Sequence, residues 1–222
     1  MGYVCDELWP SETRLVDAME KWRGSEEPTQ TVFTLSDPSG EAYFDIIKHD
    51  AKRAQRLADI MQFLQSSPPL SLSFLVKDLE WETEGSPEIM VDIGGSHGSI
   101  SIELLRKFPN LRSIVQDLQD TITTALVPED LTDRLDFKIH NFFEEQPVKN
   151  ADLYFLRSIL HDWSEKYAIK ILKNLVPALK KGAKVIVNEV CLPEPNILSY
   201  HEQLIRYTFA RHIYYSKMIA DN

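Results

Sequence analysis

The residues best suited to chemistry lie in one glycine-rich turn and in an acidic position downstream of it. Residues 91–98 read VDIGGSHG. The end of an apolar run, which contains Asp92, is followed there by a turn with three glycines. Glycines at a sharp strand-to-helix turn let a ligand touch the backbone. Asp117 follows 23 positions after Gly94, close to the spacing of roughly 20 residues at which a carboxylate reaches ribose hydroxyls. The pattern therefore predicts a site for a nucleoside-type ligand.

Two other interpretations of this turn stay open at this point. Gly94, Ser96 and Gly98 also form G-x-S-x-G, the nucleophile-elbow pattern of hydrolases, for which a later acid and His161 would complete a triad. A strand-to-helix turn that binds nothing is the third interpretation, with Asp117 as a solvated turn residue. We favour the ligand site because Asp92, two residues before the first glycine, would suit a nucleoside or an amino-acid group.

The elements that must position these residues follow Pro87, where apolar runs alternate with amphipathic segments. Strands that are apolar throughout and separated by helices favour a parallel sheet covered on both faces, an α/β fold. The spacing predicts helices at 99–108 and 164–180, the second ending at Lys180, Lys181 and Gly182 as a basic, glycine-capped C-terminus. The predicted strands are 88–94, 111–117, 135–140, 151–157 and 183–192.

The residues before this alternation predict a helical preface. A polar loop is expected at 24–31, a helix at 49–64, and a second amphipathic helix at 71–81. Ser11 is the predicted N-cap of an earlier helix, whose apolar positions are Trp9, Leu15, Val16, Met19 and Trp22. The polar connector at 82–87 divides the chain into a helical region, 1–86, and a domain, 87–222.

Composition excludes several classes of partner. There are 24 basic and 34 acidic residues, a net charge of −10 and a pI of about 5.1. Such a surface repels nucleic acid and anionic lipid, so we expect neither nucleic acid nor membrane as a partner. Cys5 and Cys191 fit neither a disulfide scaffold nor a metal cluster. With no signal-peptide pattern at the N-terminus, we expect a cytoplasmic protein that needs no metal.

Five blocks of the chain, taken in order, resemble the plant- and fungal-type S-adenosylmethionine-dependent O-methyltransferases. They are VDIGGSHG, VQDL (115–118), HNFFEEQP (140–147), DLYFLRSILHDW (152–163) and LKKGAKVIVNE (179–189). The blocks are most like those of fungal members that methylate aromatic polyketides. The resemblance implies S-adenosyl-L-methionine as cofactor and a phenolic small molecule as substrate. It also implies a Rossmann-like class I methyltransferase sheet of strand order 3-2-1-4-5, without the family's final antiparallel strand pair.

The resemblance assigns roles to single residues as well. Asn141 stands where relatives carry an aspartate at the adenine; it keeps an acceptor oxygen but loses a charge, so we expect weaker cofactor binding. His161 and Asp162 take the catalytic position, because an imidazole of pKa near 6.5 can accept the proton of a phenol of pKa near 10. The implied cofactor-binding residues are Asp92, Gly94, Gly95, Gly98, Asp117, Leu118, Asn141, Phe142 and Arg157.

Other positions receive weaker assignments. Leu57 and Met61, one turn apart on the predicted 49–64 helix, match positions that line the acceptor pocket in relatives, although core packing is the commoner role for such a pair. His97 lies in the glycine turn and is treated as incidental.

Relatives carry further segments on both sides of the region matched here. Theirs include an N-terminal dimerisation region and a C-terminal segment whose acidic residue steadies the catalytic histidine. Without the last strand pair, 183–192 becomes a sheet edge, for which we expect self-association or association with a full-length relative. Two functional alternatives remain beside the methyltransferase: a cofactor-binding relative that no longer methylates, such as a pericyclase or pseudoenzyme, and a non-catalytic fragment.

Overall fold

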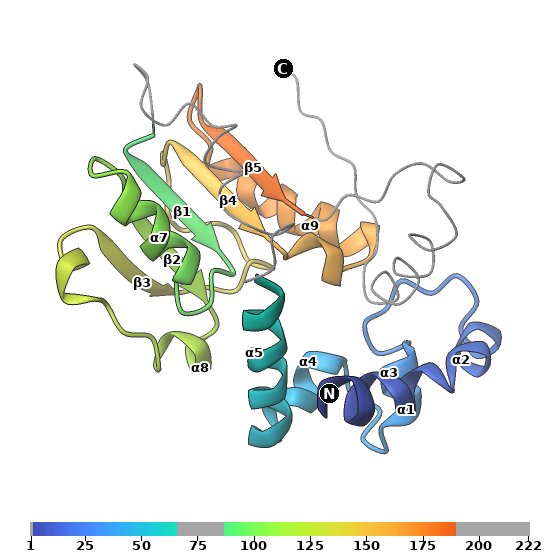
Figure 1. The fold of residues 1–222 in the computed structure, drawn as a ribbon. Helices are drawn as coiled ribbons and strands as arrows, with labels where there is room; N and C mark the ends of the chain where they lie inside the picture. The colour runs from blue at the N-terminus through green and yellow to red at the C-terminus, as the bar shows by residue number, and fades with distance from the viewer. Residues whose placement is uncertain (1, 66–86, 190–222) are drawn as a thin grey trace, which may run out of the picture. The chain divides into compact units, whose positions relative to one another are not determined.

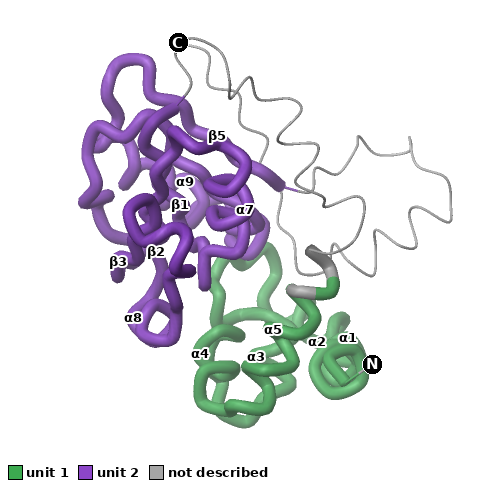
Figure 2. The backbone as a smooth tube through the Cα atoms, turned by 60° about the vertical axis from the view of Figure 1, so that its left-hand side comes forward, with its two compact units in different colours: residues 1–74 green, residues 75–222 purple. Residues whose placement is uncertain are grey.

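The computed structural model describes residues 2–65 and 87–189 of the chain. It forms two compact units, residues 1–74 and 75–222 (Figure 2). The predicted boundary between 86 and 87 adjoins residues outside the described ranges and stays a prediction. The helix predicted at 71–81 also lies outside the described residues. So does the segment beginning at Ser199, where the pattern Ser199-x-x-Glu202 predicts the start of another helix.

Unit 2 contains a five-stranded parallel sheet of order β3-β2-β1-β4-β5 (Figure 1). This order confirms the prediction, and each predicted strand is present in shortened form. Because every neighbouring pair is parallel, the carboxyl ends of all five strands meet at one edge of the sheet. The strands are β1 (Ile89–Ile93), β2 (Arg112–Asp117), β3 (Leu135–Ile139), β4 (Leu153–Arg157) and β5 (Lys184–Asn188).

Two helices cover opposite faces of this sheet. In β1, the side chains of Val91 and Ile93 pack in a buried cluster with Ile171 of α9 (Glu165–Leu175). Asp92, which points to the other face of the strand, accepts a hydrogen bond from Ser101 of α7 (Ser99–Lys107). Shorter elements complete the unit: α8 (Gln119–Ile122), η3 (Glu129–Leu131), η4 (Leu160–Asp162) and η5 (Val176–Ala178).

The second predicted helix of this unit is shorter than expected. It ends at Leu175, and Pro177 lies in a short 3₁₀ turn, because proline has no N–H to continue the helical ladder. The prediction that Lys180 and Gly182 terminate this helix was therefore wrong. Lys180 instead forms an ion pair with Asp152, and Gly182 adopts a left-handed φ of +85° in the turn before β5.

Unit 1 is helical, as predicted. Its elements are η1 (Val4–Leu8), α1 (Trp9–Glu12), α2 (Leu15–Lys21), α3 (Val32–Ser36), α4 (Tyr43–Lys48) and α5 (Ala51–Gln65). The prediction of Ser11 as an N-cap was wrong: it lies inside α1, and its hydroxyl donates to the Glu7 carbonyl. Asp50 caps α5 by accepting the N–H groups of Lys52 and Arg53.

A buried ion-pair network holds the ends of unit 1 together. The Glu7 side chain is 1% exposed and lies 2.7 Å from Arg53 and 3.1 Å from Arg56. Arg53 also pairs with Asp37 at 2.9 Å. Removing one partner of such a network leaves a buried charge without compensation, which makes the network a strong constraint on this arrangement of helices.

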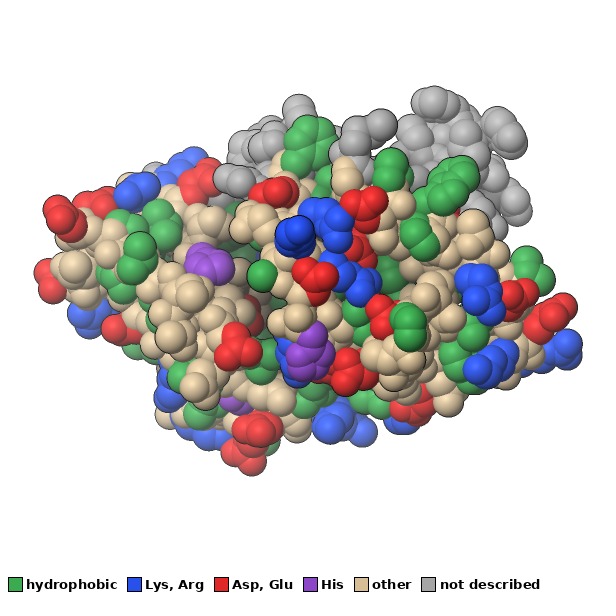
Figure 3. Space-filling view, turned by 90° about the horizontal axis from the view of Figure 1, so that it is seen from below, with side chains coloured by type: hydrophobic (Ala, Val, Ile, Leu, Met, Phe, Trp, Pro, Cys, Tyr) green, Lys and Arg blue, Asp and Glu red, His purple; other side chains and the backbone are tan. Residues whose placement is uncertain are grey.

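The surface carries both signs of charge. On the face seen in Figure 3, acidic and basic side chains are interspersed. None of the helices in the described ranges is long and apolar enough to cross a membrane.

Candidate functional site

The glycine turn joins β1 to α7 at the carboxyl edge of the sheet. The N–H groups of Gly94 and Gly95 both donate to the Gln116 carbonyl, at 2.8 and 3.1 Å, which ties the turn to β2. Three residues adopt left-handed φ values: Gly94 (+70°), Ser96 (+53°) and Gly98 (+72°). Only glycine adopts this region without cost, so the sequence requirement at two of the three positions is conformational.

Contacts also favour glycine at Gly94, Gly95 and Gly98, and at Gly95 they are the reason for glycine, because its φ is not left-handed. A Cβ on Gly95 would lie 2.5 Å from Cγ of Asp92, and one on Gly94 would lie 2.4 Å from Cδ1 of Ile159. At Gly98 a Cβ would lie 3.1 Å from the Phe137 ring. The turn therefore packs closely on the side chains around it, which leaves little room for a Cβ at these positions.

Asp92 is a buried carboxylate beneath this turn. It is 3% exposed and accepts a 2.6 Å hydrogen bond from the Ser101 hydroxyl. The pKa of Asp92 is raised to about 6: burial raises it most and the nearby Asp117 charge adds to this, while the Ser101 hydrogen bond and Arg157 oppose the rise. A cationic ligand group above the turn would favour the charged form of this acid.

We expect Asp92→Asn to stabilise the unliganded protein at pH 8. The pKa is about 6 when folded against 3.8 ordinarily, so the folded state binds the extra proton. Stability therefore rises as pH falls through 6 toward 3.8, and is lowest above 6. Asparagine cannot ionise, so it avoids the free-energy cost of keeping a buried carboxylate charged. At pH 8 this cost is about 1–3 kcal/mol, because one pKa unit corresponds to about 1.36 kcal/mol. Urea unfolding at pH 8 and pH 4 measures the difference; a less stable variant at pH 8 would contradict this assignment.

Asp117 ends β2 next to the turn. Its Oδ2 accepts the Ser96 N–H at 2.9 Å and its Oδ1 accepts the Leu118 N–H at 2.8 Å. A carboxylate offers about four acceptor positions, so two hydrogen bonds leave capacity for a ligand's hydroxyls. Leu118 is 56% exposed beside it.

The segment after β3 brings aromatic side chains to the same edge. Asn141 Oδ1 accepts the Phe143 N–H at 3.0 Å, forming a turn. The Phe142 ring lies 5.9 Å from the Trp163 ring in an edge-to-face arrangement, and its Cε1 would be 3.7 Å from a Cβ on Gly94. The predicted adenine-side residues therefore do lie next to the glycine turn.

Arg157 ends β4 and is half-buried. Its guanidinium donates to the Asn188 side-chain oxygen. Burial lowers its pKa, and the charges of Asp92, Glu103 and Glu189 oppose that shift. Arg157 thus supplies the positive charge that faces Asp92 in this part of the sheet edge.

His161 lies in η4, just past the end of β4, and is held by a carboxylate. Its Nδ1 is 2.6 Å from Oε2 of Glu189, and its Nε2 is 3.3 Å from Oδ1 of Asp162. The other oxygen of Glu189 accepts the N–H groups of Ile159 and Leu160, both at 2.8 Å. One carboxylate, with its side chain 9% exposed, therefore orients both the imidazole and the backbone that carries it.

The charges around His161 set its protonation. Burial lowers the pKa of the imidazole, but the Glu189 hydrogen bond and the Asp162 and Glu189 charges outweigh burial and raise it above 6.5. Burial raises the pKa of Asp162 to about 6, the positive imidazole opposes this, and Glu189 adds to it. The imidazole is therefore a stronger base than an isolated histidine.

We expect Glu189→Gln to lower the pKa of His161 below its ordinary value. With the carboxylate gone, burial remains as the main influence on the imidazole and favours its neutral form. An NMR titration of the imidazole resonances in both proteins measures the shift. His140, whose pKa is lowered by burial at the end of β3, is the control and should not move. An unchanged pKa of His161 would mean that Glu189 does not raise it.

Glu189 is the functional residue that sequence reasoning missed. An acid that steadies the histidine was expected from a later segment, yet one lies in the described chain, directly after β5. The predicted strand 183–192 placed Glu189 inside the strand; only the observed end of β5 at Asn188 places this acid at the sheet edge beside the strand that precedes His161. The Ser158 N–H donates to the Asn188 carbonyl at 3.1 Å, which brings the two strand ends together.

Leu57 and Met61, the residues predicted to line the acceptor pocket, belong to unit 1. Leu57 is partly buried on α5 and Met61 is 40% exposed. Their role in binding an acceptor stays a prediction.

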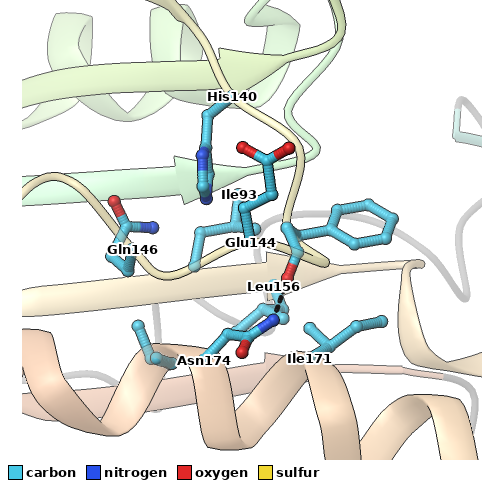
Figure 4. A pocket seen from close by; sticks show the side chains of 9 residues that line it. Ile93, His140, Glu144, Gln146, Leu156, Ile171 and Asn174 are labelled. Atoms are coloured by element: carbon cyan, nitrogen blue, oxygen red, sulfur yellow. Dashed lines mark hydrogen bonds between the residues drawn. The ribbon is translucent and has the colours of Figure 1, made fainter.

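A small pocket lies between the loop after β3 and α9 (Figure 4). His140, Glu144 and Gln146 from the loop face Asn174 and Ile171 of α9 across it, and Asn174 donates to the Phe142 carbonyl. The pocket has a cavity volume of about 10 Å³, enough for about one water molecule. This pocket is too small for an aromatic acceptor.

The structure does not support the nucleophile-elbow hypothesis, because Ser96 is not part of a catalytic triad in the described residues. The imidazole nearest the Ser96 hydroxyl is that of His97, at 3.2 Å. The other nitrogen of His97 lies 3.0 Å from the Thr124 hydroxyl and not beside a carboxylate, while His161 is bound by Glu189. In the described part of the chain, the serine, histidine and acid of that mechanism are not assembled.

The residues at this sheet edge fit S-adenosyl-L-methionine. Gly95 leaves no room for even a methyl group between the turn and the buried Asp92 carboxylate, so the turn packs directly on that carboxylate. Carboxylates lie at the ends of β1 and β2, aromatic rings follow β3, and a histidine paired with a carboxylate follows β4. A parallel sheet of this order, with such a turn after its first strand, is a Rossmann-like fold.

Comparisons with known proteins identify the family. A model described as the O-methyltransferase domain matches residues 14–213, so this chain belongs to the O-methyltransferase family. It is 49% identical over 207 residues to O-methyltransferase kk1A of Curvularia clavata, covering 93% of this chain and 48% of that protein. It is 40% identical over 205 residues to O-methyltransferase AMT9 of Alternaria alternata, covering 89% and 46%. The chain spans about half the length of these curated relatives.

Solved structures share the fold. LepI in complex with SAM superposes with a TM-score of 0.75 at 26% identity, covering 95% of this chain and 55% of that one. Human N-acetylserotonin methyltransferase in complex with SAM gives a TM-score of 0.73 at 22% identity, covering 96% and 58%; at that identity the likeness concerns the fold alone.

Proposed function

We propose that this chain is the cofactor-binding and catalytic part of an S-adenosyl-L-methionine-dependent O-methyltransferase that methylates a phenolic hydroxyl of an aromatic small molecule. The observation that carries the proposal is the pairing of His161 with Glu189, at 2.6 Å. It lies at the carboxyl edge of the same sheet as the glycine turn. The family shown above, with fungal O-methyltransferases among its members, supports the reaction type.

The proposed roles follow from the geometry. The cofactor supplies an electrophilic methyl group whose transfer forms an O–CH₃ bond and breaks an S–CH₃ bond. Glu189 accepts the Nδ1–H of His161 and leaves Nε2 to take the phenol proton. Asp162, beside Nε2, favours the imidazolium that results. Holding acceptor and base in place supplies much of the remaining rate.

The proposed cofactor contacts come from four strand ends. Asp117 would accept from the ribose hydroxyls, and Leu118 would pack on the adenosine. Asn141 and Phe142 would meet the adenine, and the turn around Asp92 would hold the amino-acid end. We also propose a cytoplasmic location, and self-association or association with a full-length relative.

A second candidate is a member that binds the cofactor without methylating. A solved structure described as a pericyclic reaction enzyme is 26% identical to this chain with a TM-score of 0.72. The His161–Glu189 pair favours methyl transfer, because a base at this edge is what a hydroxyl acceptor requires. A non-catalytic fragment, the third possibility, would bind neither cofactor nor acceptor.

Transfer of radiolabelled methyl to a panel of phenols tests the proposal. We expect labelled product with at least one phenol, and much less of it when excess unlabelled S-adenosylhomocysteine competes with the labelled cofactor. Cofactor binding without any labelled product across the panel would favour the second candidate.

A further inference from the structure

A closed ring of hydrogen bonds joins the glycine turn to the segment after β2. On one side, the Asp117 carboxylate accepts the N–H groups of Ser96 and Leu118 at 2.9 and 2.8 Å. On the other, His97 lies 3.2 Å from the Ser96 hydroxyl and 3.0 Å from the Thr124 hydroxyl. The 118–124 segment closes the ring through its own turn, in which the Thr121 N–H donates to the Leu118 carbonyl at 3.1 Å.

The direction of each hydrogen bond follows from the donors available. The Thr124 hydroxyl donates to the Thr121 carbonyl at 3.0 Å, so toward His97 it acts as an acceptor. His97 therefore carries its proton on Nε2, and its Nδ1 accepts from the Ser96 hydroxyl. An imidazole in this tautomer bonds to both hydroxyls, and few other side chains can accept on one side and donate on the other over this span.

Ser96 is the residue this ring constrains most. Its φ of +53° is left-handed, a region that costs energy for a residue with a Cβ. That conformation aims the Ser96 N–H at Asp117. The bond from the Ser96 hydroxyl to His97, itself anchored on Thr124, holds the serine there.

The geometry points to His97 as a positioning residue for the adenosine part of the cofactor. It acts through Ser96 on Asp117, whose remaining acceptor positions then face the ribose in one orientation. The inference rests on the proposed function, because it needs a ribose-bearing cofactor at Asp117. His97 was treated as incidental from the sequence, since its partner Thr124 is 27 positions away.

Exposure separates this role from a purely structural one. His97, Ser96 and Thr124 are exposed, so water can replace the lost hydrogen bonds when the ring is broken, and folding stability should change little. Cofactor binding should change more, because a loosened Asp117 and Ser96 must be ordered again on binding.

The test is a double-mutant cycle read by calorimetric titration with S-adenosylhomocysteine. We expect His97→Ala and Thr124→Val each to raise Kd about five- to tenfold, and the double variant to bind within about twofold of His97→Ala, because both changes open one ring. His97→Gln, whose Nε2 can still donate to Thr124, should recover part of the affinity. His49→Ala, at an exposed histidine in unit 1, is the matched control and should leave Kd unchanged.

Thermal unfolding of the same proteins completes the test, with Tm expected to change by no more than about 2 °C because the ring is exposed. Wild-type affinity in His97→Ala would overturn the inference. So would weakened binding in His97→Ala with none in Thr124→Val, since the imidazole would then act on the ligand directly. A large fall in Tm parallel to the loss of binding would reduce His97 to a structural role. If the wild-type chain binds no S-adenosylhomocysteine, the proposed function fails first.

Discussion

His161→Ala is expected to lower the rate of methyl transfer by about 10²–10⁴-fold, the usual contribution of a positioned general base. The histidine side chain is 19% exposed and held by Glu189, so its loss removes the proposed base at the end of β4. Cofactor affinity should stay within about threefold, because the assigned cofactor contacts lie on other residues. Steady-state rates combined with calorimetric titration separate the two quantities.

The pH dependence of the rate and the acidity of the acceptor phenol test this prediction further. The wild-type rate should rise with pH through the pKa of His161, which lies above 6.5, because the neutral imidazole is the active form. His161→Ala should lose that limb and should be least impaired with acidic phenols, which ionise without help. A variant as fast as wild type with a weakly acidic phenol would show that His161 is not the base.

Gly95→Ala is expected to weaken cofactor binding by at least about tenfold and to destabilise the fold by about 1–3 kcal/mol, as overpacking of a filled site does. The added Cβ would lie 2.5–2.9 Å from the three carboxyl atoms of Asp92. That carboxylate is buried and bonded to Ser101, so either it or the turn must move. Calorimetric titration and urea unfolding measure the two effects.

Gly182→Ala is the matched control for this change. Gly182 has a left-handed φ of +85° and nothing within 4 Å of the position a Cβ would take, so alanine there costs backbone strain of about 1–2 kcal/mol and no affinity. Adding Asp92→Ala to Gly95→Ala should recover part of the stability but not the binding. If Gly95→Ala binds cofactor as wild type does, the close approach at Gly95 has no role in the site.

The sheet could be predicted because its signals are local. β1 and β4 are short apolar runs that are buried along most of their length, the pattern of strands covered on both faces. The edge strands β3 and β5 are more exposed and carry a weaker pattern. The order of the strands came from the family resemblance, not from the runs themselves. Two local errors had local causes: Pro177 ends α9 early, and Ser11 lies within a helix that begins before it.

The site could be predicted only in part, because some of its contacts depend on which strand ends meet. Asp92, Asp117 and the glycines lie on one strand-turn-helix unit or on the strand beside it. Glu189 reaches His161 across 28 positions because β4 and β5 are neighbours, and His97 reaches Thr124 through a turn that follows β2. Pattern and spacing along the chain carry no direct trace of such pairs.

The most direct measurement is a calorimetric titration of the purified chain with S-adenosylhomocysteine, the demethylated product of the proposed cofactor. One saturable site per chain is predicted, with a Kd between about 1 μM and 1 mM, the range typical of enzyme ligands. Asp117→Ala should abolish or strongly weaken the same signal. Absence of saturable heat from the wild-type protein up to about 1 mM would contradict the assignment of this sheet edge as a cofactor site.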